Sequence, residues 1–281
     1  MTGTGTQSDP YIPTTLTEFI QAVGTAGAYV TLTQDINAAD DPEYTGEMAM
    51  PITWAAASVQ GGGFTLLGLT LRTSASAIRF AKGITIDALT IEVGFKRDAR
   101  FDMLVAYGSG SKPLFSSCLF RIKLDEGAYG GSFLDELSFQ DCAMSISTTA
   151  ETAANADFFW TCDFLRTTIH FTTEMLRASG ASAIIGTSCT FVRSAVIFAQ
   201  LTASSGSFSL VGSGAASNGL MYSYVAVLAL SGSIAISQSG SSCIIAIDPS
   251  ASISIIQSGW TRATIDQMKD KDWLTSVGFL P

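Results

Sequence analysis

Charged side chains are scarce in this sequence, and the scarcity excludes several classes of protein. Of the 281 residues only 14% are Asp, Glu, Lys or Arg, and the acids outnumber the bases to give a net charge of −9. A nucleic-acid-binding surface needs concentrated positive charge, which this chain lacks. The single histidine, His170, and the absence of any C-x-x-C pair leave no metal-ligand pattern. The glycine run at 61–63 is followed by neither a helix pattern nor a lysine, so we predict no phosphate-binding cofactor loop.

Long hydrophobic runs are absent as well. The most apolar stretch, from Val225 to Ile236, is interrupted by Ser231 and Gly232 and is too short to span a bilayer. The first residues lack the basic start and apolar core of a secretory signal peptide. The five cysteines, an odd number, form no short disulfide framework. We therefore expect a chain that is made in the cytosol and contacts no membrane.

What the sequence does have is repeated alternation of apolar and small polar residues. In a first repeat, the segment from Gly63 to Leu71 resembles the one from Gly83 to Ile91; in a second repeat, Ser233–Gly240 resembles Ser252–Gly259. Alternation with period 2 is typical of a strand with one buried face, and a recurring strand-turn-strand unit predicts a stacked solenoid. We expect an all-β solenoid of about nine coils between Val59 and about Ser258. The expected inward positions are Phe64, Leu66, Leu69, Leu71, Ile84, Ile86, Leu89, Ile91, Phe120, Phe139, Phe164, Ile169, Phe191, Ile197, Ile234, Ile236, Ile253 and Ile255.

The cysteines share one local pattern, in which a small or polar residue precedes Cys and an apolar residue follows two positions later. They are Cys118, Cys142, Cys162, Cys189 and Cys243. The spacing from Cys189 to Cys243 is twice that from Cys162 to Cys189, which predicts one inward-facing column with Cys acting as a small hydrophobic residue. The alternative is five unrelated strand cysteines, because any inward Cys would have an apolar neighbour two residues on.

The two ends of the chain differ from the region between them, and we divide it at 1–27, 28–258 and 259–281. In the first part Thr15 and Glu18 form a capping-box pattern, and an apolar helix face follows. This helix ends at Gly24, before a strand over 28–32, and would cover the open end of the solenoid. The residues of the capping box and apolar face are Thr15, Leu16, Glu18, Phe19, Ile20 and Val23.

The last part, 259–281, carries a second capping box at Thr264 and Gln267, which predicts a short helix through about Asp272. An apolar segment follows it. This segment either caps the last coil, which we favour, or docks on another subunit. Its apolar residues are Trp273, Leu274, Val277, Phe279 and Leu280.

Carboxylates are the only candidates for chemistry. An acidic, irregular stretch from Asp35 to Pro51, with five carboxylates up to Glu47, is expected to be a solvated loop rather than a calcium site, because it lacks a D-x-D-x-D-G pattern. Glycan cleavage would need two carboxylates about 5–10 Å apart at a groove. The candidates for such a site are Asp135, Glu136, Asp141, Asp157, Asp163 and Glu174, with Arg166, His170 and Arg177 nearby. We expect these carboxylates to be isolated and solvated, and His170 to point outward, so no catalytic, cofactor-binding or metal residue is predicted.

Exposed aromatic residues could bind sugar or another protein surface, although their pattern is not specific. They are Tyr222, Tyr224 and Trp260.

Both ends carry motifs of a known kind of protein. Three motifs resemble the start of β-helical proteins encoded by phages and prophages of gut bacteria: Gly3–Ile12, Thr15-x-x-Glu18-Phe19 and Gly24-x-x-x-Ala28-Tyr-Val30. The segment from Ile265 to Phe279 resembles the end of such proteins. These motifs cover only the two ends of the chain, whereas the solenoid between them is similar only in pattern. The resemblance implies a right-handed parallel β-helix that forms a homotrimer on a virion.

From this resemblance we expect a non-enzymatic structural protein of a bacteriophage virion, a capsid decoration or head fibre that is made in the cytoplasm of the host bacterium. Its partners would be other virion proteins and host-surface or mucosal glycans. The alternative is a tailspike or tail-fibre type of protein that binds or cleaves host glycans. A third reading, a bacterial surface adhesin, is disfavoured because the sequence shows no signal peptide and no anchor.

Overall fold

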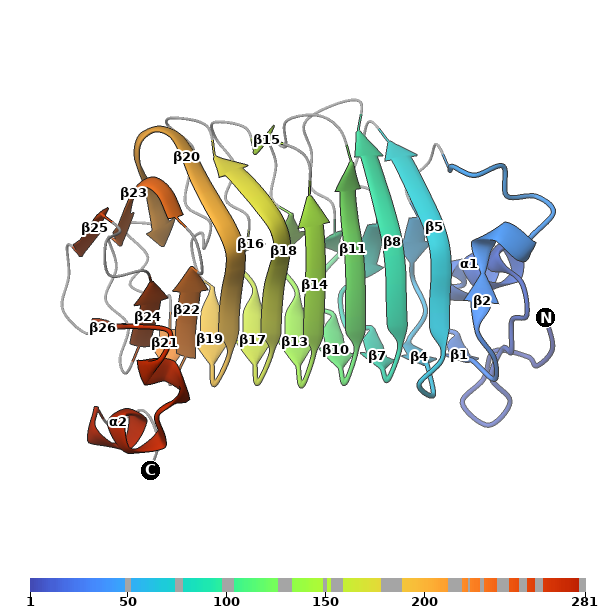
Figure 1. The fold of residues 1–281 in the computed structure, drawn as a ribbon. Helices are drawn as coiled ribbons and strands as arrows, with labels where there is room; N and C mark the ends of the chain where they lie inside the picture. Colours follow the sequence, from blue (N-terminus) through green and yellow to red (C-terminus); the bar gives the residue numbers. More distant parts are fainter. Residues whose placement is uncertain are drawn as a thin grey trace.

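The structure is a computed structural model that describes residues 1–48, 52–73, 78–97, 104–125, 133–148, 151–152, 159–177, 189–211, 219–221, 223–227, 230–236, 243–247, 252–255 and 260–277. The strands of these ranges pair in parallel and stack as a β-solenoid (Figure 1). Helix α1 (Leu16–Gly24) lies at the N-terminal end and α2 (Lys271–Ser276) lies near the other end. The predicted all-β parallel β-helix with a short N-terminal helix and a helical C-terminal tail is therefore confirmed.

Three sheets contain the strands of the described ranges. The eight-stranded sheet consists, in spatial order, of β1 (Tyr29–Thr31), β4 (Ser58–Gln60), β7 (Thr85–Asp87), β10 (Leu114–Ser116), β13 (Ser138–Gln140), β17 (Asp163–Leu165), β19 (Thr190–Val192) and β21 (Gly219–Met221). The five-stranded sheet consists of β3 (Ile52–Trp54), β6 (Ile78–Ala81), β9 (Leu104–Tyr107), β12 (Leu134–Asp135) and β16 (Phe159–Trp160).

The thirteen-stranded sheet contains the longest strands. Ten of them follow one path, in the order β2 (Ile36–Asn37), β5 (Thr65–Thr73), β8 (Thr90–Arg97), β11 (Leu119–Asp125), β14 (Ala143–Thr148), β18 (Thr168–Arg177), β20 (Ala195–Val211), β22 (Ser223–Val227), β24 (Cys243–Ile247) and β26 (Trp260–Ala263). Three more pair beside this path: β15 (Glu151–Thr152), β23 (Leu230–Ile236) and β25 (Ser252–Ile255).

In the described part of the chain five consecutive coils carry a strand in each of the three sheets, from β3-β4-β5 to β16-β17-β18, rather than the nine expected coils. The in-register column of the eight-stranded sheet marks the length of one coil. That column contains Val59, Ile86, Phe115, Phe139, Phe164, Phe191 and Leu220. Each step of this column is longer than the step from Gly63 to Gly83, so the predicted repeat is too short for these coils.

One of the two sequence repeats is a true structural repeat and the other is not. Ser233–Ile236 on β23 pairs in register with Ser252–Ile255 on β25, as the second repeat predicts. By contrast Leu66 on β5 pairs with Ile91, whereas the first repeat would align it with Ile86. Ile86 belongs to β7, which lies in a different sheet from β5. Because every coil has several alternating strands, a similar pattern recurs within a coil as well as between coils.

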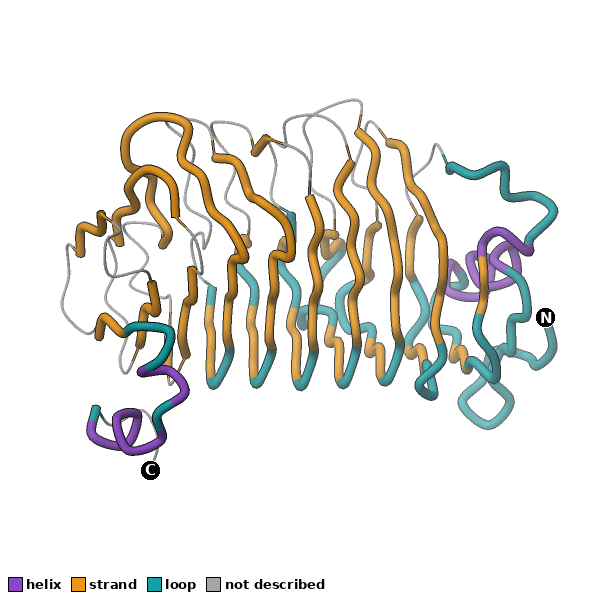
Figure 2. Tube along the Cα trace, in the orientation of Figure 1, coloured by secondary structure: helices purple, strands orange, loops and turns teal. Residues whose placement is uncertain are grey.

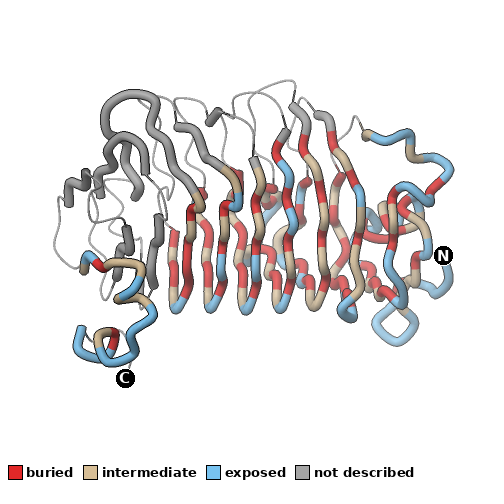
Figure 3. Tube along the Cα trace, in the orientation of Figure 1, coloured by how far each residue is buried: buried red, intermediate tan, exposed pale blue. Residues whose placement is uncertain are grey.

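The inward side chains form one continuous core, and buried and exposed residues alternate along the strands (Figure 3). Of the expected inward positions, Phe64 and Ile197 are partly exposed, and Ile234, Ile236, Ile253 and Ile255 lie where burial is not described. The other expected positions are buried. Aromatic rings stack along the axis. Phe139 lies between Phe115 and Phe164, at centroid distances of 5.0 and 5.3 Å.

Two corners of the solenoid, rather than one column, hold the described cysteines. Cys118 and Cys142 precede β11 and β14, at the turns from the eight-stranded to the thirteen-stranded sheet (Figure 2). Cys243 falls in the same register, one residue before the partner of Tyr224. Cys162 and Cys189 instead precede β17 and β19, at a second corner. The prediction of one shared column is wrong for these two. In earlier coils the large buried residues Ile84 and Leu137 hold the position of Cys162 and Cys189, so a cysteine at this corner does not mark the first column.

The N-terminal segment covers its end of the solenoid, as predicted. Glu18 N–H donates to Thr15 Oγ1 at 3.2 Å, which caps α1, whereas the Glu18 carboxylate accepts from Thr14 N–H rather than from Thr15. Phe19 contacts Trp54 of β3 edge-on, with ring centroids 5.2 Å apart. The backbone of Tyr11 pairs with the outer edge of β1. Helix and loop together protect the first strands from pairing with another chain.

The C-terminal tail differs in detail from the prediction. Thr264 and Gln267 form the expected capping box, with Thr264 N–H to Gln267 Oε1 at 2.8 Å. It opens the 3₁₀ turn Gln267–Lys269, and the helix proper starts only at Lys271, after Asp270 caps it. Leu274 is buried with Ala263 and packs near Ile197 of β20. The tail thus contacts the solenoid. Whether it also docks on another subunit stays a prediction, and Phe279 and Leu280 lie outside the described residues.

Candidate functional site

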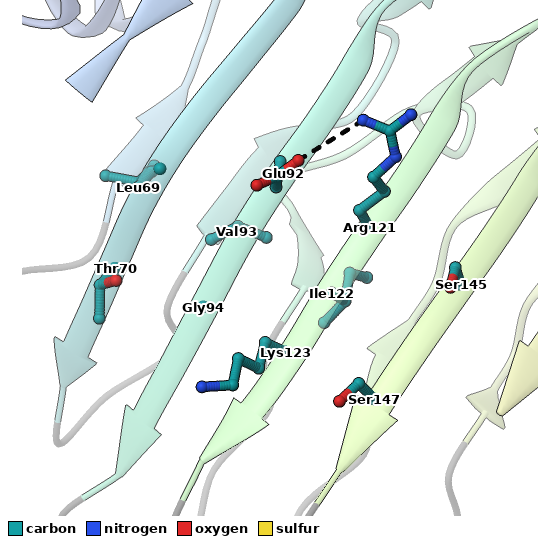
Figure 4. A pocket seen from close by; sticks show the side chains of 11 residues that line it. Leu69, Thr70, Glu92, Val93, Gly94, Arg121, Ile122, Lys123, Ser145 and Ser147 are labelled. Atoms are coloured by element: carbon teal, nitrogen blue, oxygen red, sulfur yellow. Dashed lines mark hydrogen bonds and ion pairs between the residues drawn. The ribbon is translucent and has the colours of Figure 1, made fainter. Parts of the chain in front are cut away.

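A groove crosses the outer face of the thirteen-stranded sheet. It has a volume of about 440 Å³ and extends over β5, β8, β11 and β14 (Figure 4). Charged and hydroxyl side chains line much of it. The lining residues are Gly68, Leu69, Thr70, Glu92, Val93, Gly94, Arg121, Ile122, Lys123, Ser145 and Ser147.

The groove exists because small residues occupy outward positions in the middle of long strands. Gly94 stands in register between Thr70 of β5 and Lys123 of β11. On the far side Lys123 pairs with Ser147 of β14, whose side chain is short. A bulge in β5 between Leu66 and Leu69 adds a further glycine, Gly68, at a φ of 68°. Outward side chains normally cover such a surface, and Gly68 and Gly94 carry none.

Three charged side chains stand around this hollow. Glu92 Oε2 lies 3.5 Å from Arg121 Nη1, and the two side chains are 46% and 53% exposed. Such a long and exposed ion pair contributes little to stability and is easily rearranged. Lys123, which is in register with Gly94, extends from β11 toward β8 (Figure 4). The groove is thus lined by charged side chains of both signs.

A second hollow, of about 430 Å³, lies over the eight-stranded sheet and contains one predicted carboxylate, Asp163. Asp163 Oδ2 accepts from Lys112 Nζ at 2.7 Å and from Ser138 Oγ at 3.2 Å. Glu136 pairs with Lys82, also at 2.7 Å. Each of these two carboxylates is therefore neutralised by a lysine from another coil.

Asp141 is likewise paired. It lies at the turn into β14, where Arg166 of the next coil donates Nε to Oδ1 at 2.5 Å and Nη2 to Oδ2 at 2.7 Å. This arginine lowers the pKa of Asp141, and Asp141 raises the pKa of Arg166. A carboxylate with a lowered pKa is a poor general acid at neutral pH. Asp141 and Asp163 do not line the same hollow, so the structure does not bring them together as an opposed pair.

The remaining candidates do not form a site either. His170 lies between the buried Ile169 and Phe171 and faces partly outward, as predicted. Asp135 is on β12, in register with Val105 and Trp160 of the five-stranded sheet. Some candidates have strand positions but no described side chains, or lie outside the described residues. They are Glu174, Arg177, Tyr224 and Trp260 in the first group, and Asp157 and Tyr222 in the second.

The acidic stretch from Asp35 to Glu47 is structural in part, which corrects the expectation of a solvated loop. Asp41 is buried and accepts Thr17 N–H at 2.6 Å and Glu43 N–H at 2.9 Å. These hydrogen bonds lower the pKa of Asp41. Asp35 accepts Thr65 N–H at 2.7 Å. Among the residues that the structure describes, no cluster of three or more His, Cys, Asp or Glu side chains is placed to hold a metal ion.

The described cysteines behave as small buried residues. The thiols of Cys118 and Cys162 donate to backbone carbonyls, at 3.3 Å to Ser116 O and at 3.2 Å to Trp160 O. Contact with Cys142 and burial raise the pKa of Cys118, and burial raises the pKa of Cys162. These two thiols are therefore protonated and unreactive at neutral pH.

Nothing in the sequence pattern alone indicates the groove. Glu92, Arg121 and Lys123 occupy outward positions of alternating strands. Only the observed coil length shows that Glu92 is in register with Arg121. The first sequence repeat is shorter than a coil, so its spacing does not predict that these two residues are in register.

Comparison of the chain with protein-family models, with curated proteins and with solved structures gives no match. None of the described helices is both long and apolar enough to cross a membrane.

Proposed function

We propose that this chain is a non-enzymatic structural protein of a bacteriophage virion, a β-helical capsid decoration or head-fibre-type protein. The observation that carries the proposal is the pair of terminal motifs, Gly3–Ile12 and Ile265–Phe279, at the two ends of a parallel solenoid. The first motif contributes to the N-terminal cover, and the second contains the tail that folds back onto β20. Such terminal segments are suited to mounting a rigid rod on a larger assembly.

The chemistry of the described carboxylates favours the structural role over catalysis. Asp141, Asp163 and Glu136 each form an ion pair with a cation of another coil. A glycan-cleaving pair would instead face a common groove, with one carboxyl group held protonated. The ion pairs tie coils together, which suits a durable display surface.

The alternative is a tailspike or tail-fibre type of protein that binds or cleaves host glycans. The groove over β5, β8, β11 and β14 supports glycan binding, because it offers charged side chains and hydroxyls on an exposed face. The proposal includes a homotrimer that contacts other virion proteins and, through exposed faces, host-surface or mucosal glycans.

Electron cryo-microscopy of purified particles that carry this chain tests where in the virion the protein lies. We expect density for the solenoid at symmetric sites on the capsid shell. Density at the tail tip would favour the alternative, and a chain absent from washed particles would overturn both. Light scattering of the purified chain tests the oligomer, with a trimer expected.

A further inference from the structure

Cys118 and Cys142 lie on successive coils, at the corner that leads into the thirteen-stranded sheet. The residues that follow them, Leu119 and Ala143, are in register, and Ala143 N–H donates to Cys118 O at 3.0 Å. Neighbouring strands are about 4.8 Å apart, which is within the range of Cα separations that a disulfide spans. A hydrogen bond between the two thiols raises the pKa of Cys118 and lowers the pKa of Cys142. The two sulfur atoms are therefore neighbours in the folded chain.

We propose that Cys118 and Cys142 form an oxidation site, at which hydrogen peroxide converts the two thiols to a disulfide that joins two coils. The Cys142 thiolate attacks one oxygen of the peroxide, so that an S–O bond forms, the O–O bond breaks and hydroxide leaves. The Cys118 thiol then attacks the Cys142 sulfur, so that an S–S bond forms, the S–O bond breaks and water leaves with the Cys118 proton. The hydroxide takes up the proton that Cys142 released. Two thiols thus lose two electrons, and the peroxide is reduced to two molecules of water.

The order of the two steps follows from the thiol pair. Cys118 donates the hydrogen bond and keeps its proton, so Cys142 is the member that becomes a thiolate and reacts with the peroxide. Cys118 reacts only with the oxidised sulfur of its neighbour. Cys142 lies at a turn between the exposed residues Asp141 and Ala143, so a molecule as small as hydrogen peroxide reaches it by local opening of that turn.

The second pair of cysteines provides an internal comparison. Cys162 and Cys189 precede Asp163 and Thr190, which are in register, so these two cysteines also lie on successive coils. Both are fully buried, and burial raises the pKa of Cys162. A thiol that keeps its proton reacts slowly with peroxide, so the first pair should form its disulfide about tenfold or more faster than the second.

Peptide mass spectrometry of the purified full chain tests the proposal. The chain is treated with hydrogen peroxide at neutral pH, and its remaining thiols are alkylated in denaturant before digestion. We expect a pair of peptides linked through Cys118 and Cys142, with a mass lower by two hydrogens than the sum of the separate peptides. The linked pair should be absent in Cys142→Ser. It should form at an unchanged rate in Cys162→Ser, the matched control.

Serine variants also test the order of the steps. Serine should fit in this column, because Ser194 holds the same position two coils beyond Cys142 and donates to Val192 O at 3.0 Å, as Cys142 donates to Gln140 O at 3.2 Å. In Cys118→Ser the oxidation should stop at the sulfenic acid, which dimedone traps on Cys142. In Cys142→Ser we expect no dimedone adduct on Cys118.

Three results would overturn the proposal: no linked peptides in the wild type, equal rates of linkage for the two cysteine pairs, or a dimedone adduct on Cys118 in Cys142→Ser. A non-reducing gel should show a monomer, and a cross-linked dimer would overturn the proposal as well, because the bond must lie within one chain. If a serine variant does not fold, the comparison of the two pairs in the wild type still decides. Because these measurements use the isolated chain, they stand apart from the location of the protein in a particle.

Discussion

At the scale of single residues, Asp41 joins the N-terminal helix to the loop that follows β2. Its carboxylate accepts Thr17 N–H in the first turn of α1, where unpaired N–H groups and the helix dipole favour a negative charge. Asp41→Ala should lower the free energy of unfolding by about 1–2 kcal/mol, as loss of an N-terminal cap does. Urea denaturation at pH 7 measures this. The matched control is Asp40→Asn, because Asp40 is exposed and its loss should cost less than about 0.5 kcal/mol.

The same residue predicts a pH dependence. The folded-state pKa of Asp41 is lowered from the ordinary value of 3.8 by the hydrogen bonds from Thr17 and Glu43. A lowered folded pKa stabilises the protein above the ordinary value, and this stabilisation disappears as the pH falls through the folded pKa. Below about pH 4 the wild type and Asp41→Asn should therefore converge in urea midpoint. A gap that persists unchanged at pH 2 would contradict this assignment.

At the scale of elements, the turn into the thirteen-stranded sheet repeats one strained conformation. Ala88, Ser117, Asp141, Arg166 and Arg193 all have left-handed φ values of 49–54° at this corner. A non-glycine residue there costs about 1–2 kcal/mol relative to the right-handed region. Ala88→Gly should therefore stabilise the protein by about 0.5–1 kcal/mol, after the extra entropy of glycine in the unfolded chain is subtracted.

The identical chemical change in a strand is its control. Ala106 lies in β9 and is 8% exposed. Ala106→Gly should destabilise the protein by about 1 kcal/mol, because glycine weakens a strand interior. Urea midpoints of the two variants should move in opposite directions, and a shift in the same direction would refute the corner argument.

These elements also show what the sequence could predict. The helix at 16–24 follows from a capping box and one apolar face, and these are local properties that the sequence states directly. The register of Ser233 with Ser252 follows from a true repeat. The register of β5 with β8 does not follow from the sequence. A bulge shifts the pairing within β5, and the alternating residues of β7 resemble those of β5 at a spacing that is too short. Side-chain alternation repeats every two residues, so it identifies strands but leaves their pairing open.

The candidate site was less predictable than the fold. Ion pairs such as Asp141 with Arg166 join residues of successive coils, and only the correct coil length brings them together. The groove depends on Gly94, which has no side chain, and a glycine in a strand does not by itself predict a groove.

At the scale of the whole molecule, each strand pairs only with strands of the neighbouring coils, so the cooperativity of the solenoid depends on the core column. Phe139 is central to it: its ring stacks on Phe115 and Phe164 and meets Phe120 edge-on at 5.7 Å. Phe139→Ala should cost about 3–5 kcal/mol, while Phe139→Leu, which keeps most of the volume, should cost less than half of that.

The Phe139→Ala substitution should also affect the coils on the two sides of β13 to different extents. Coils on the N-terminal side of β13 retain the cap formed by α1, with Phe19 packed on Trp54, and lose contacts on one side only. Hydrogen exchange of Phe139→Ala should therefore leave amides of β4, β7 and β8 more protected than those of β17 and β18. Uniform loss of protection along the chain would mean that the coils unfold as one unit, and that coupling between coils exceeds what one aromatic ring contributes.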